Sequence, residues 1–444
     1  MSRPSRRPST RRKRTGASRR SLYGLLTASV VSVAGTRVSA IALPWFVLTT
    51  TGSAGKTGLV VLFELTPYVL VKALGGPLID RRGPRVVSLT ADVASAVVAG
   101  CIPLLYATGQ LTLPVLLGLV ALLGCARGPG DAAKSALVPA VADSAGLPLE
   151  RVTGLEGTAN RTASIVAPGL AGVLIAAIGP ASAVLADALS FAVAAVLIGV
   201  TAPRHTPPHE EVSEAAYLHR LRQGWDFLRR EPLLRAAMAM VAVTNWLDAA
   251  YGTVLLPVWV RDHGFGPELI GLLGSTFGLT ATLGSLLATA WSARLPRRLT
   301  YLVGFTLCGA PRFVALAMGA PVAVLVGVGV VGGFGAGFIN PVLGAIMLER
   351  IPRHLVGRVG SLSDAVCWVG IPLGGVSAGA AIALVGLAPA LAVAGGLYFV
   401  TTLLPGLRPE WREMDRRRVS GLQPEPALAA AGPGAAAAAP APPA

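Results

Sequence analysis

The decapeptide GPLIDRRGPR, from Gly76 to Arg85, joins two strongly apolar stretches and decides how they are arranged. It places one acid, Asp80, among the arginines Arg81, Arg82 and Arg85 and contains a helix-breaking Gly-Pro pair. Neither unpaired charges nor the free backbone of a turn is tolerated in hydrocarbon. We therefore predict that the decapeptide is a tight turn at a water interface, between two membrane-spanning helices.

The composition is that of a polytopic membrane protein. Of the 444 residues, 53% are hydrophobic and 14% are charged, whereas soluble domains carry about 25% charged residues. The mean hydropathy is +0.64. Apolar runs of about 20 residues, enough to cross a hydrocarbon core, recur along the chain. They predict an all-α protein with twelve transmembrane helices at 22–49, 57–79, 86–107, 112–138, 151–178, 181–201, 234–260, 268–292, 299–319, 321–348, 359–384 and 387–406.

These spans form two groups of six, separated by a polar segment. The predicted organisation is a basic disordered cytoplasmic tail at 1–21, a six-helix bundle at 22–202, a cytoplasmic linker at 203–233, a second six-helix bundle at 234–407, and a disordered cytoplasmic tail at 408–444 that is first basic and then Ala/Pro-rich. Within the linker, an amphipathic helix from Glu214 to Arg230 repeats its apolar residues at spacings of three and four, namely Leu218, Leu221, Trp225 and Leu228. We expect this helix to lie along the inner membrane surface.

The two halves also resemble each other. One constant shift aligns Gly58 with Gly271, Arg85 with Arg298 and Leu89 with Leu302, while Asp80 falls on Ala293. Internal duplication is expected when two six-helix halves enclose a central site. The second copy has kept the basic residues and lost the acid.

The net charge of +16 reports membrane topology. When the spans alternate sides, Lys and Arg gather on the side that holds the decapeptide and both termini, and the opposite side has only Lys56 and Arg261. Such an excess marks the cytoplasmic face of the membrane. A nucleic-acid partner would need a basic face with base-reading or stacking groups, which the sequence lacks.

Enzymatic and metal chemistry find no support in the residue pattern. Cys101, Cys125, Cys308 and Cys367 fall in apolar spans without paired spacing, which is typical of buried structural thiols. The five histidines are scattered, so no metal site is predicted. Neither a phosphate-binding loop nor a nucleophile with a base partner is present, and we predict that the protein is not an enzyme.

The spacing Gly76-x-x-x-Asp80-Arg81-x-Gly83-x-Arg85 resembles the signature of the loop between helices 2 and 3 in the major facilitator superfamily of transporters. The resemblance implies two pseudo-symmetric bundles that open alternately to the two sides of the membrane. It also implies that Asp80 contacts the start of helix 11, at Gly360 and Ser361 here, as a gate that favours the outward-open state. A turn that only sets topology is the alternative.

Helix 4 carries three charges at spacings of four and three, Arg127, Asp131 and Lys134. They share one helical face, which should point into the bundle because ionised groups facing lipid are costly. Arg127 lies in a run that loosely resembles the basic helix-4 motif of the superfamily. Proton coupling through Arg127 and Asp131 and purely structural pairing both remain open.

Glu64 on helix 2 is the first candidate for the proton-carrying group. It lies at a depth comparable to that of Arg37 on helix 1, which predicts an Arg37–Glu64 pair. A carboxylate that alternates between an arginine and a proton can couple proton flow to transport. Asp248 on helix 7 is the second candidate, and a structural role is an equal alternative for each.

Helix 5 contains Ala163, Ala167, Pro168, Gly169 and Gly172 at the spacing of the glycine-proline motif of drug antiporters, which it resembles with alanines at several glycine positions. Small residues permit close helix packing and the proline favours a bend. The motif favours export over import.

Further segments resemble the bacterial drug and siderophore efflux branch of the superfamily, which includes macrolide and enterobactin exporters. They are Ala42 to Trp45, Gly224 to Leu234, and the pair Gly357-Arg358. The resemblance implies a proton-coupled antiporter that exports a drug-like or secondary-metabolite molecule. Import of a small metabolite is the alternative, followed by a non-transporting sensor.

The expected partners are a small-molecule substrate, protons and the lipid bilayer, with no cofactor beyond the proton gradient, and we expect a monomer. Aromatic and amide side chains within the spans are candidates for the substrate pocket: Trp45, Phe63, Trp246, Asn245, Asn340 and Trp368.

Overall fold

The computed structural model describes residues 15–204, 214–291, 295–352, 355–406, 408–412 and 414–415. Every regular element in these ranges is helical, and 12 helices are long and apolar enough to cross a membrane. The predicted fold class is therefore confirmed. The predicted tails at 1–14 and 416–444, linker residues 205–213 and the pair Ala293 and Arg294 lie outside the described residues.

The first bundle consists of six long helices and one short one. They are α1 (Thr15–Thr51), α2 (Ala54–Leu74), the short α3 (Gly76–Arg82), α4 (Pro84–Ala107), α5 (Leu113–Ala145), α6 (Leu149–Ile178) and α7 (Pro180–Thr201). Helix boundaries follow glycine and proline chemistry. Gly83 and Gly179 have φ of +80° and +82°, which favours glycine, and each precedes a proline in the first helical turn.

The second bundle follows α8 (Glu214–Arg230), whose bounds match the predicted amphipathic helix. Three of its six spans are continuous helices: α11 (Pro267–Trp291), α14 (Val322–Arg350) and α17 (Leu387–Gly406). The other three are interrupted. They consist of α9 (Pro232–Ala250), the π-helical turn η1 (Tyr251–Leu255) and α10 (Leu256–Asp262); of α12 (Arg297–Cys308) and α13 (Ala310–Ala317); and of α15 (Val356–Trp368) and α16 (Ile371–Val385).

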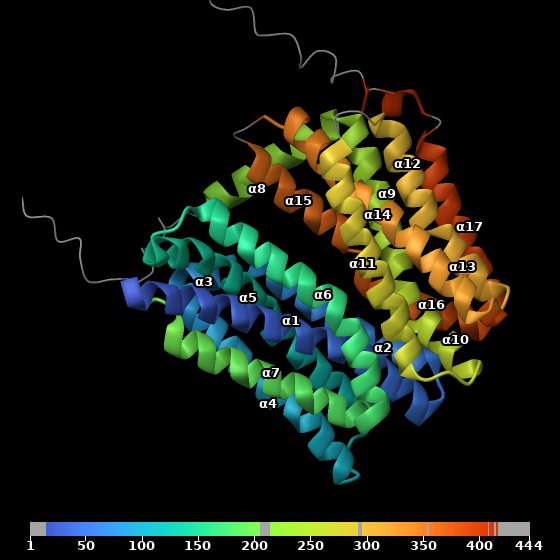
Figure 1. Ribbon diagram of the computed structural model, residues 1–444, viewed down its shortest axis with the longest axis horizontal. Helices are drawn as coiled ribbons and strands as arrows, with labels where there is room; N and C mark the ends of the chain where they lie inside the picture. The colour runs from blue at the N-terminus through green and yellow to red at the C-terminus, as the bar shows by residue number, and fades with distance from the viewer. Residues whose placement is uncertain are drawn as a thin grey trace, which may run out of the picture.

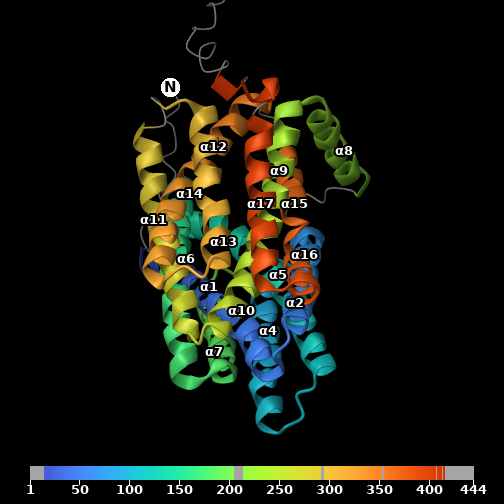
Figure 2. The same ribbon diagram turned by 90° about the vertical axis from the view of Figure 1, so that its right-hand side faces the viewer.

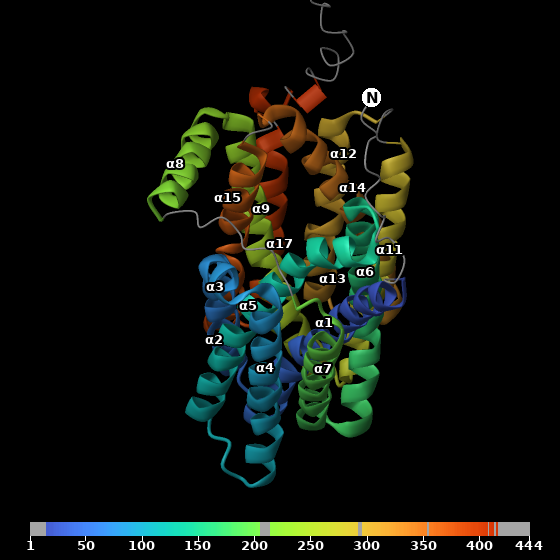
Figure 3. The ribbon, with the colours of Figure 1, turned by 90° about the vertical axis from the view of Figure 1, so that its left-hand side faces the viewer.

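The two bundles form a V (Figure 1). One side of the molecule holds α3, α8 and the segment after α17, and we call it the linker side; the α1–α2 and α10–α11 connections lie on the far side. The bundles diverge toward the linker side and converge on the far side. Figures 2 and 3 show α8 outside the second bundle, beside α15, with which it is in contact.

Glycines join the bundles on the far side. α2 packs along α16, where a Cβ on Gly58 would overlap the backbone of Gly375 and one on Gly379 would meet the carbonyl oxygen of Ala54 at 2.8 Å. α6 packs along α11, where a Cβ on Gly172 would lie 2.8 Å from the Cα of Glu268. Small residues therefore let the two backbones approach directly.

Arg261 adds a polar contact across the same side. At the end of α10, its Nη1 donates to the carbonyl oxygen of Gly52, at 3.2 Å, and to that of Leu48, at 3.5 Å. These are carbonyls at the C-terminal end of α1, where a cation is favoured. One of the two basic residues predicted for this side thus ties the second bundle to the first.

The internal repeat is visible in a matching contact of the two halves. Arg85, at the start of α4, donates to the carbonyl oxygen of Gly199 near the end of α7 at 2.5 Å. Arg298, at the start of α12, donates in the same way to the carbonyl oxygen of Gly406 at the end of α17. The two arginines that the sequence aligns therefore hold the final helix of each bundle.

Several predicted boundaries were wrong. The first seven residues of the decapeptide form a separate helix, α3, which ends before Gly83, because the glycine adopts a positive φ and the residues before it keep helical hydrogen bonds. α1 begins at Thr15, so the last part of the predicted tail 1–21 is helical. Beyond α17, Trp411 is fully buried against Tyr301, at a ring separation of 5.6 Å, so part of the predicted disordered tail is packed.

Gly58→Ala tests the contact between the bundles. The new Cβ overlaps the Gly375 backbone, and forcing such a shift costs about 1–3 kcal/mol. We expect a lower unfolding temperature in a thermal scan of the purified protein. Gly157→Ala on α6 is the control, because open space surrounds that position and alanine favours a helix. Equal melting of the two variants would contradict the inferred packing.

Candidate functional site

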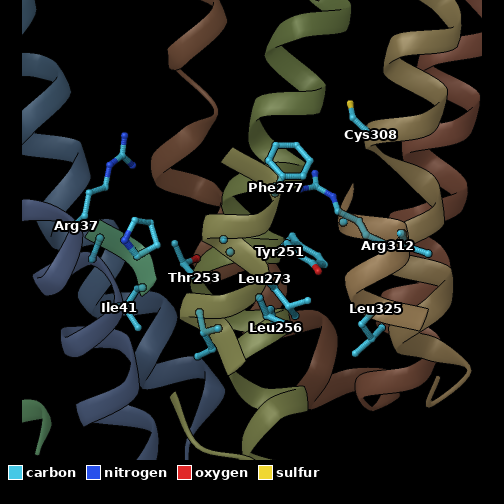
Figure 4. Close-up of a pocket in the computed structure, with 17 residues that line it drawn as sticks. Arg37, Ile41, Tyr251, Thr253, Leu256, Leu273, Phe277, Cys308, Arg312 and Leu325 are labelled. Carbon is cyan, nitrogen blue, oxygen red and sulfur yellow. The ribbon is translucent and has the colours of Figure 1, made fainter. Parts of the chain in front are cut away.

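A cavity of about 330 Å³ lies where the two bundles meet. Figure 4 shows α1 side chains on one side of it, η1 and α11 in the middle, and Arg312 and Leu325 on the other side. It is lined by Arg37, Ala40, Ile41, Pro168, Tyr251, Gly252, Thr253, Leu256, Ile270, Leu273, Gly274, Phe277, Cys308, Arg312, Leu325, Val328 and Gly329. Both bundles therefore build the cavity, as a site for alternating access requires.

Interrupted helices shape the second-bundle wall. The π-helical turn Tyr251–Leu255 precedes Pro257, and the break at Gly309 precedes Pro311. A proline removes the hydrogen bond to the carbonyl four residues earlier, which favours an irregular turn at each place. π-turns and discontinuous helices are common at functional sites. The interruptions turn Tyr251, Thr253, Cys308 and Arg312 toward the cavity.

Arg312 is held in an aromatic and acidic environment. It forms an ion pair with Asp248 on α9. Its guanidinium carbon lies 4.5 Å from the ring centroid of Tyr251, 5.3 Å from that of Phe313 and 5.9 Å from that of Phe277. Cation–π contacts and a paired carboxylate stabilise a charge within the bundle.

Arg37 reaches the same cavity from α1, on the side away from Arg312 (Figure 4). Its side chain is exposed, and it has no hydrogen bond or ion pair to any residue that the structure describes. The cavity thus contains one arginine with an acidic partner and one without.

Glu64 is paired with Arg127, and the predicted Arg37–Glu64 pair was wrong. Arg127 Nη1 donates to Glu64 Oε1 at 2.6 Å, and both side chains are 8% exposed. The reason lies in α5, where a Cβ on Gly124 would overlap the Glu64 carbonyl and one on Gly128 would lie 2.8 Å from that of Tyr68. These glycines let α5 pack closely against α2, which places Arg127 beside the Glu64 carboxylate.

Lys134 and Asp131, the other two charges of the predicted α5 face, also turn into the first bundle. Lys134 donates to Asp92 at 2.7 Å and to Ser32 at 2.8 Å, and its side chain is 6% exposed. Asp131 accepts a hydrogen bond from the hydroxyl of Tyr68 at 3.1 Å. Each charge on this face has a polar partner, as groups within a membrane-spanning bundle require.

Lys72 extends this network to the second bundle. Its Nζ donates to the Tyr68 hydroxyl at 3.1 Å and lies 5.0 Å from the ring centroid of Trp368, at the end of α15. A cation–π contact therefore crosses between the bundles on the α2–α15 side.

The expected contact of Asp80 with helix 11 is absent in this arrangement. Asp80 is exposed on α3 and forms no hydrogen bond or ion pair with any described residue. α3 and α15, which carries Gly360 and Ser361, stand on the two separate arms of the V (Figure 1). Arg81 is exposed as well. The divergence of the bundles on the linker side separates the two halves of the expected gate.

The helix-5 motif lies against the other bundle. Ala163, Ala167 and Gly172 are buried, and the backbone N–H of Gly169 donates to Ser275 Oγ on α11 at 2.8 Å. A Cβ on Gly271 of α11 would overlap the Pro168 carbonyl oxygen. The motif therefore forms part of the junction between the bundles, and Pro168 also lines the cavity.

The structure places all six predicted pocket residues outside the cavity of Figure 4. Trp45 is buried in the core, Trp246 donates to Ser377 at 2.9 Å, and Asn245 donates to the Cys367 carbonyl at 3.0 Å. Asn340 lines a second cavity of about 500 Å³, together with Asn160 and Arg161. Phe63 and Trp368 are 41% and 39% exposed. None of the six lines the cavity of Figure 4.

Comparison with known proteins identifies the family. The sequence profile described as Major Facilitator Superfamily matches residues 25–266 and 238–430. The chain belongs to the major facilitator superfamily. Members of this family are transporters, so the prediction that the chain is a multi-pass membrane transporter and no enzyme is confirmed.

Relatives within the superfamily cover nearly the whole chain. It is similar to the multidrug efflux pump Tap of Mycobacterium tuberculosis, with 31% identity over 407 residues that cover 88% of this chain and 94% of the relative. Tap of Mycolicibacterium fortuitum is 28% identical over 418 residues, covering 90% and 98%. The staphyloferrin A transporter of Staphylococcus aureus is 23% identical over 272 residues, covering 60% and 65%.

Solved structures of the superfamily share the fold. The crystal structure of the nucleoside transporter NupG is similar with a TM-score of 0.69 and 14% identity, covering 89% of this chain and 98% of that one. The structure of a bacterial homologue of the human lysosomal transporter Spinster, in an inward-facing and unoccupied conformation, is similar with a TM-score of 0.65 and 15% identity. The match covers 93% of this chain and 99% of that one.

Sequence reasoning missed several residues that line the cavity of Figure 4. Leu256, Leu273 and Phe277 are ordinary apolar residues of membrane helices, and no sequence signal separates them from lipid-facing ones. The prolines at 257 and 311 were the available signal, because they interrupt helices of the second half. The described residues contain no cluster of His, Cys, Asp and Glu side chains that could hold a metal ion.

A double-mutant cycle tests the Glu64–Arg127 pair. Arg127→Met alone leaves a buried carboxylate without its cation, which costs about 3–5 kcal/mol. Adding Glu64→Gln removes that carboxylate charge and should restore most of the stability, as measured by thermal unfolding in detergent.

The same cycle on Arg297 and Glu349 is the control. Its carboxylate is 41% exposed, so a coupling of about 1 kcal/mol or less is expected. Equal coupling energies in the two cycles would contradict the inferred burial of the Glu64 pair.

Proposed function

We propose that this protein is a proton-coupled antiporter that exports drug-like or secondary-metabolite molecules from a bacterial cell. The observation that carries the proposal is the buried Glu64–Arg127 pair beside the junction of the two bundles. A buried carboxylate that is either ionised and bound to an arginine or protonated and free has two states, and transport can be coupled to the change between them.

The direction of transport rests on the relatives. Two of them carry the name multidrug efflux pump, and the match covers 94% and 98% of their lengths. The helix-5 motif of Pro168 and Gly172 lies at the junction of the bundles, where a small-residue contact can open and close. Together these observations support export.

The orientation follows from charge. The linker side carries the basic residues of α3, namely Arg81 and Arg82, and those near the end of α8, namely Arg229 and Arg230. Excess Lys and Arg marks the cytoplasmic side. We therefore assign the linker side and both termini to the cytoplasm, so that the described arrangement is open toward the cell interior.

A transport cycle follows from this assignment. A substrate enters between the diverging bundles and reaches the cavity of Figure 4. When the bundles rock, the glycine contacts on the far side separate, and Asp80 meets the start of α15 at Gly360 and Ser361. A proton from outside then neutralises Glu64 and releases Arg127. The return to the inward-open state delivers the proton to the cytoplasm and restores the ion pair.

In this scheme the proton gradient is the only energy source. The chain requires no cofactor and works as a monomer, because each bundle of one chain supplies one wall of the cavity. Asp248, paired with Arg312 in the other bundle, is the second candidate for a proton-carrying group. Lys134 and Asp92 are assigned a structural role, since they lie within one bundle away from the cavity.

Glu64→Gln separates coupling from binding. Purified protein in proteoliposomes with an internal pH dye should move protons when an exported compound is added, and Glu64→Gln should reduce this flux to the level of empty liposomes. Exchange of labelled compound across the membrane without a gradient should persist, because glutamine mimics the protonated state. Asp226→Asn on α8, an exposed carboxylate, is the control and should retain the flux. Loss of both flux and exchange in Glu64→Gln would instead indicate a structural role.

Asp80→Asn tests the gate. Spin labels at positions 143 and 235, exposed on the linker side of different bundles, should report a short-distance population when this side closes. We expect the substitution to deplete that population, because the neutral side chain binds the positive end of α15 less strongly. Glu150→Gln, also exposed on the linker side, should leave it unchanged. An unaltered distance distribution in Asp80→Asn would contradict the gate.

A further inference from the structure

The cavity between the bundles carries one positive charge that has no acidic partner among the described residues. Arg37 lines it from α1, and it has no acidic partner among the described residues. The carboxylate at a comparable depth, Glu64, is already bound to Arg127. The second arginine of the cavity, Arg312, is bound to Asp248.

The remaining acids near the first bundle do not compensate Arg37. Asp187 is fully buried in α7 and accepts a hydrogen bond from Ser39 at 2.5 Å, and it does not line the cavity. Asp131 accepts from Tyr68, and Lys72 lies on the same tyrosine. None of these acids forms an ion pair with Arg37, so of the two charged side chains that line the cavity, Arg37 is the one without an acidic partner among the described residues.

Apart from its arginines, the cavity is largely apolar. Ile41, Leu256, Leu273, Phe277 and Leu325 form much of its wall. Its volume of about 330 Å³ is at the lower end of the range for small-molecule sites. A ligand with a compact aromatic or aliphatic body fits these walls.

We propose that the transported molecule is an amphipathic organic anion, with an apolar ring system that fills the cavity and one carboxylate, sulfonate or acidic enol that pairs with Arg37. This inference rests on the proposed export function and specifies its substrate class. A guanidinium binds such groups through two parallel hydrogen bonds, which gives both affinity and orientation.

Closure of the linker side strengthens the preference. While the bundles diverge, water can solvate Arg37. When the cavity closes, an unpaired cation loses that water at a high cost, unless the ligand supplies the opposite charge. A lipophilic cation would instead bring a like charge to Arg37, which is unfavourable at low dielectric.

Two probes with one ring skeleton test the inference: 1-anilinonaphthalene-8-sulfonate, an anion, and N-phenyl-1-naphthylamine, its neutral counterpart. Binding is measured by calorimetry on the full-length protein in lipid nanodiscs, after subtraction of empty nanodiscs. We expect the anion to bind about tenfold or more tightly than the neutral probe. Arg37→Gln should remove this difference by weakening the anion alone, and Arg37→Lys should retain part of it.

Arg161→Gln is the matched control, because Arg161 is an exposed arginine that lines the neighbouring cavity. It should leave the affinities for both probes unchanged. Equal binding of the two probes to the unaltered protein, tighter binding of tetraphenylphosphonium than of the anion, or equal weakening of both probes by Arg37→Gln would each overturn the inference.

The outcome is distinguishable from failure of the export proposal. Anion binding that depends on Arg37, without any compound-dependent proton flux, would retain the ligand class and contradict the antiport. Proton flux driven by tetraphenylphosphonium but not by organic anions would retain the antiport and overturn the ligand class.

Discussion

A charge within a membrane-spanning bundle must find a partner there, and α5 is organised by this requirement. Arg127 and Lys134 are nearly buried, and each is held by a carboxylate from a neighbouring helix, Glu64 of α2 and Asp92 of α4. The pairs fix the rotation of α5 about its axis and bring two further helices against it. Arg37 has no carboxylate partner among the described residues, and it lies where the first bundle meets the second. The packing of one bundle thus determines the electrostatics of the central cavity.

The forces within the bundles differ from those between them. The ion pairs Glu64–Arg127, Asp92–Lys134 and Asp248–Arg312 each join helices of one bundle, and the first two are buried. The contacts across the junction include backbone approaches at glycines, hydrogen bonds from Arg261 to carbonyl groups, the hydrogen bond from Gly169 to Ser275 and the placement of Lys72 over Trp368. Separating the bundles therefore breaks none of these three ion pairs, which keeps the cost of the movement low.

Hydropathy and the spacing of apolar residues were enough to predict the spans and the linker helix, because bilayer thickness and backbone satisfaction constrain these features strongly. Which charged residues pair with each other was harder to predict from the sequence. A comparable depth along the membrane suggested that Arg37 pairs with Glu64. Gly124 and Gly128 instead let α5 approach α2 closely, so that Arg127 forms the ion pair with Glu64. Sequence distance says nothing about which helix faces are in contact.

The walls of the cavity were the least predictable part of the site. Aromatic and amide residues were expected there, yet Trp246 and Asn245 serve helix packing. Much of the wall consists of leucine, isoleucine and phenylalanine, whose identity is the same whether they face lipid or a ligand. Only the three-dimensional structure shows which of these residues line the cavity.

The π-helical turn at Tyr251–Leu255 has a consequence for how this chain tolerates change. Such a turn holds one residue more than the α-helical turn that it replaces, and each residue of an α-helix advances the side-chain direction by about 100°. Deleting a single residue here would restore regular winding and keep the span long enough for the bilayer. It would also rotate Tyr251 and Thr253 relative to Leu256, so the lining would change while the fold survived. A one-residue difference in length at this turn is therefore a route by which related chains can acquire different ligand preferences without new folding requirements.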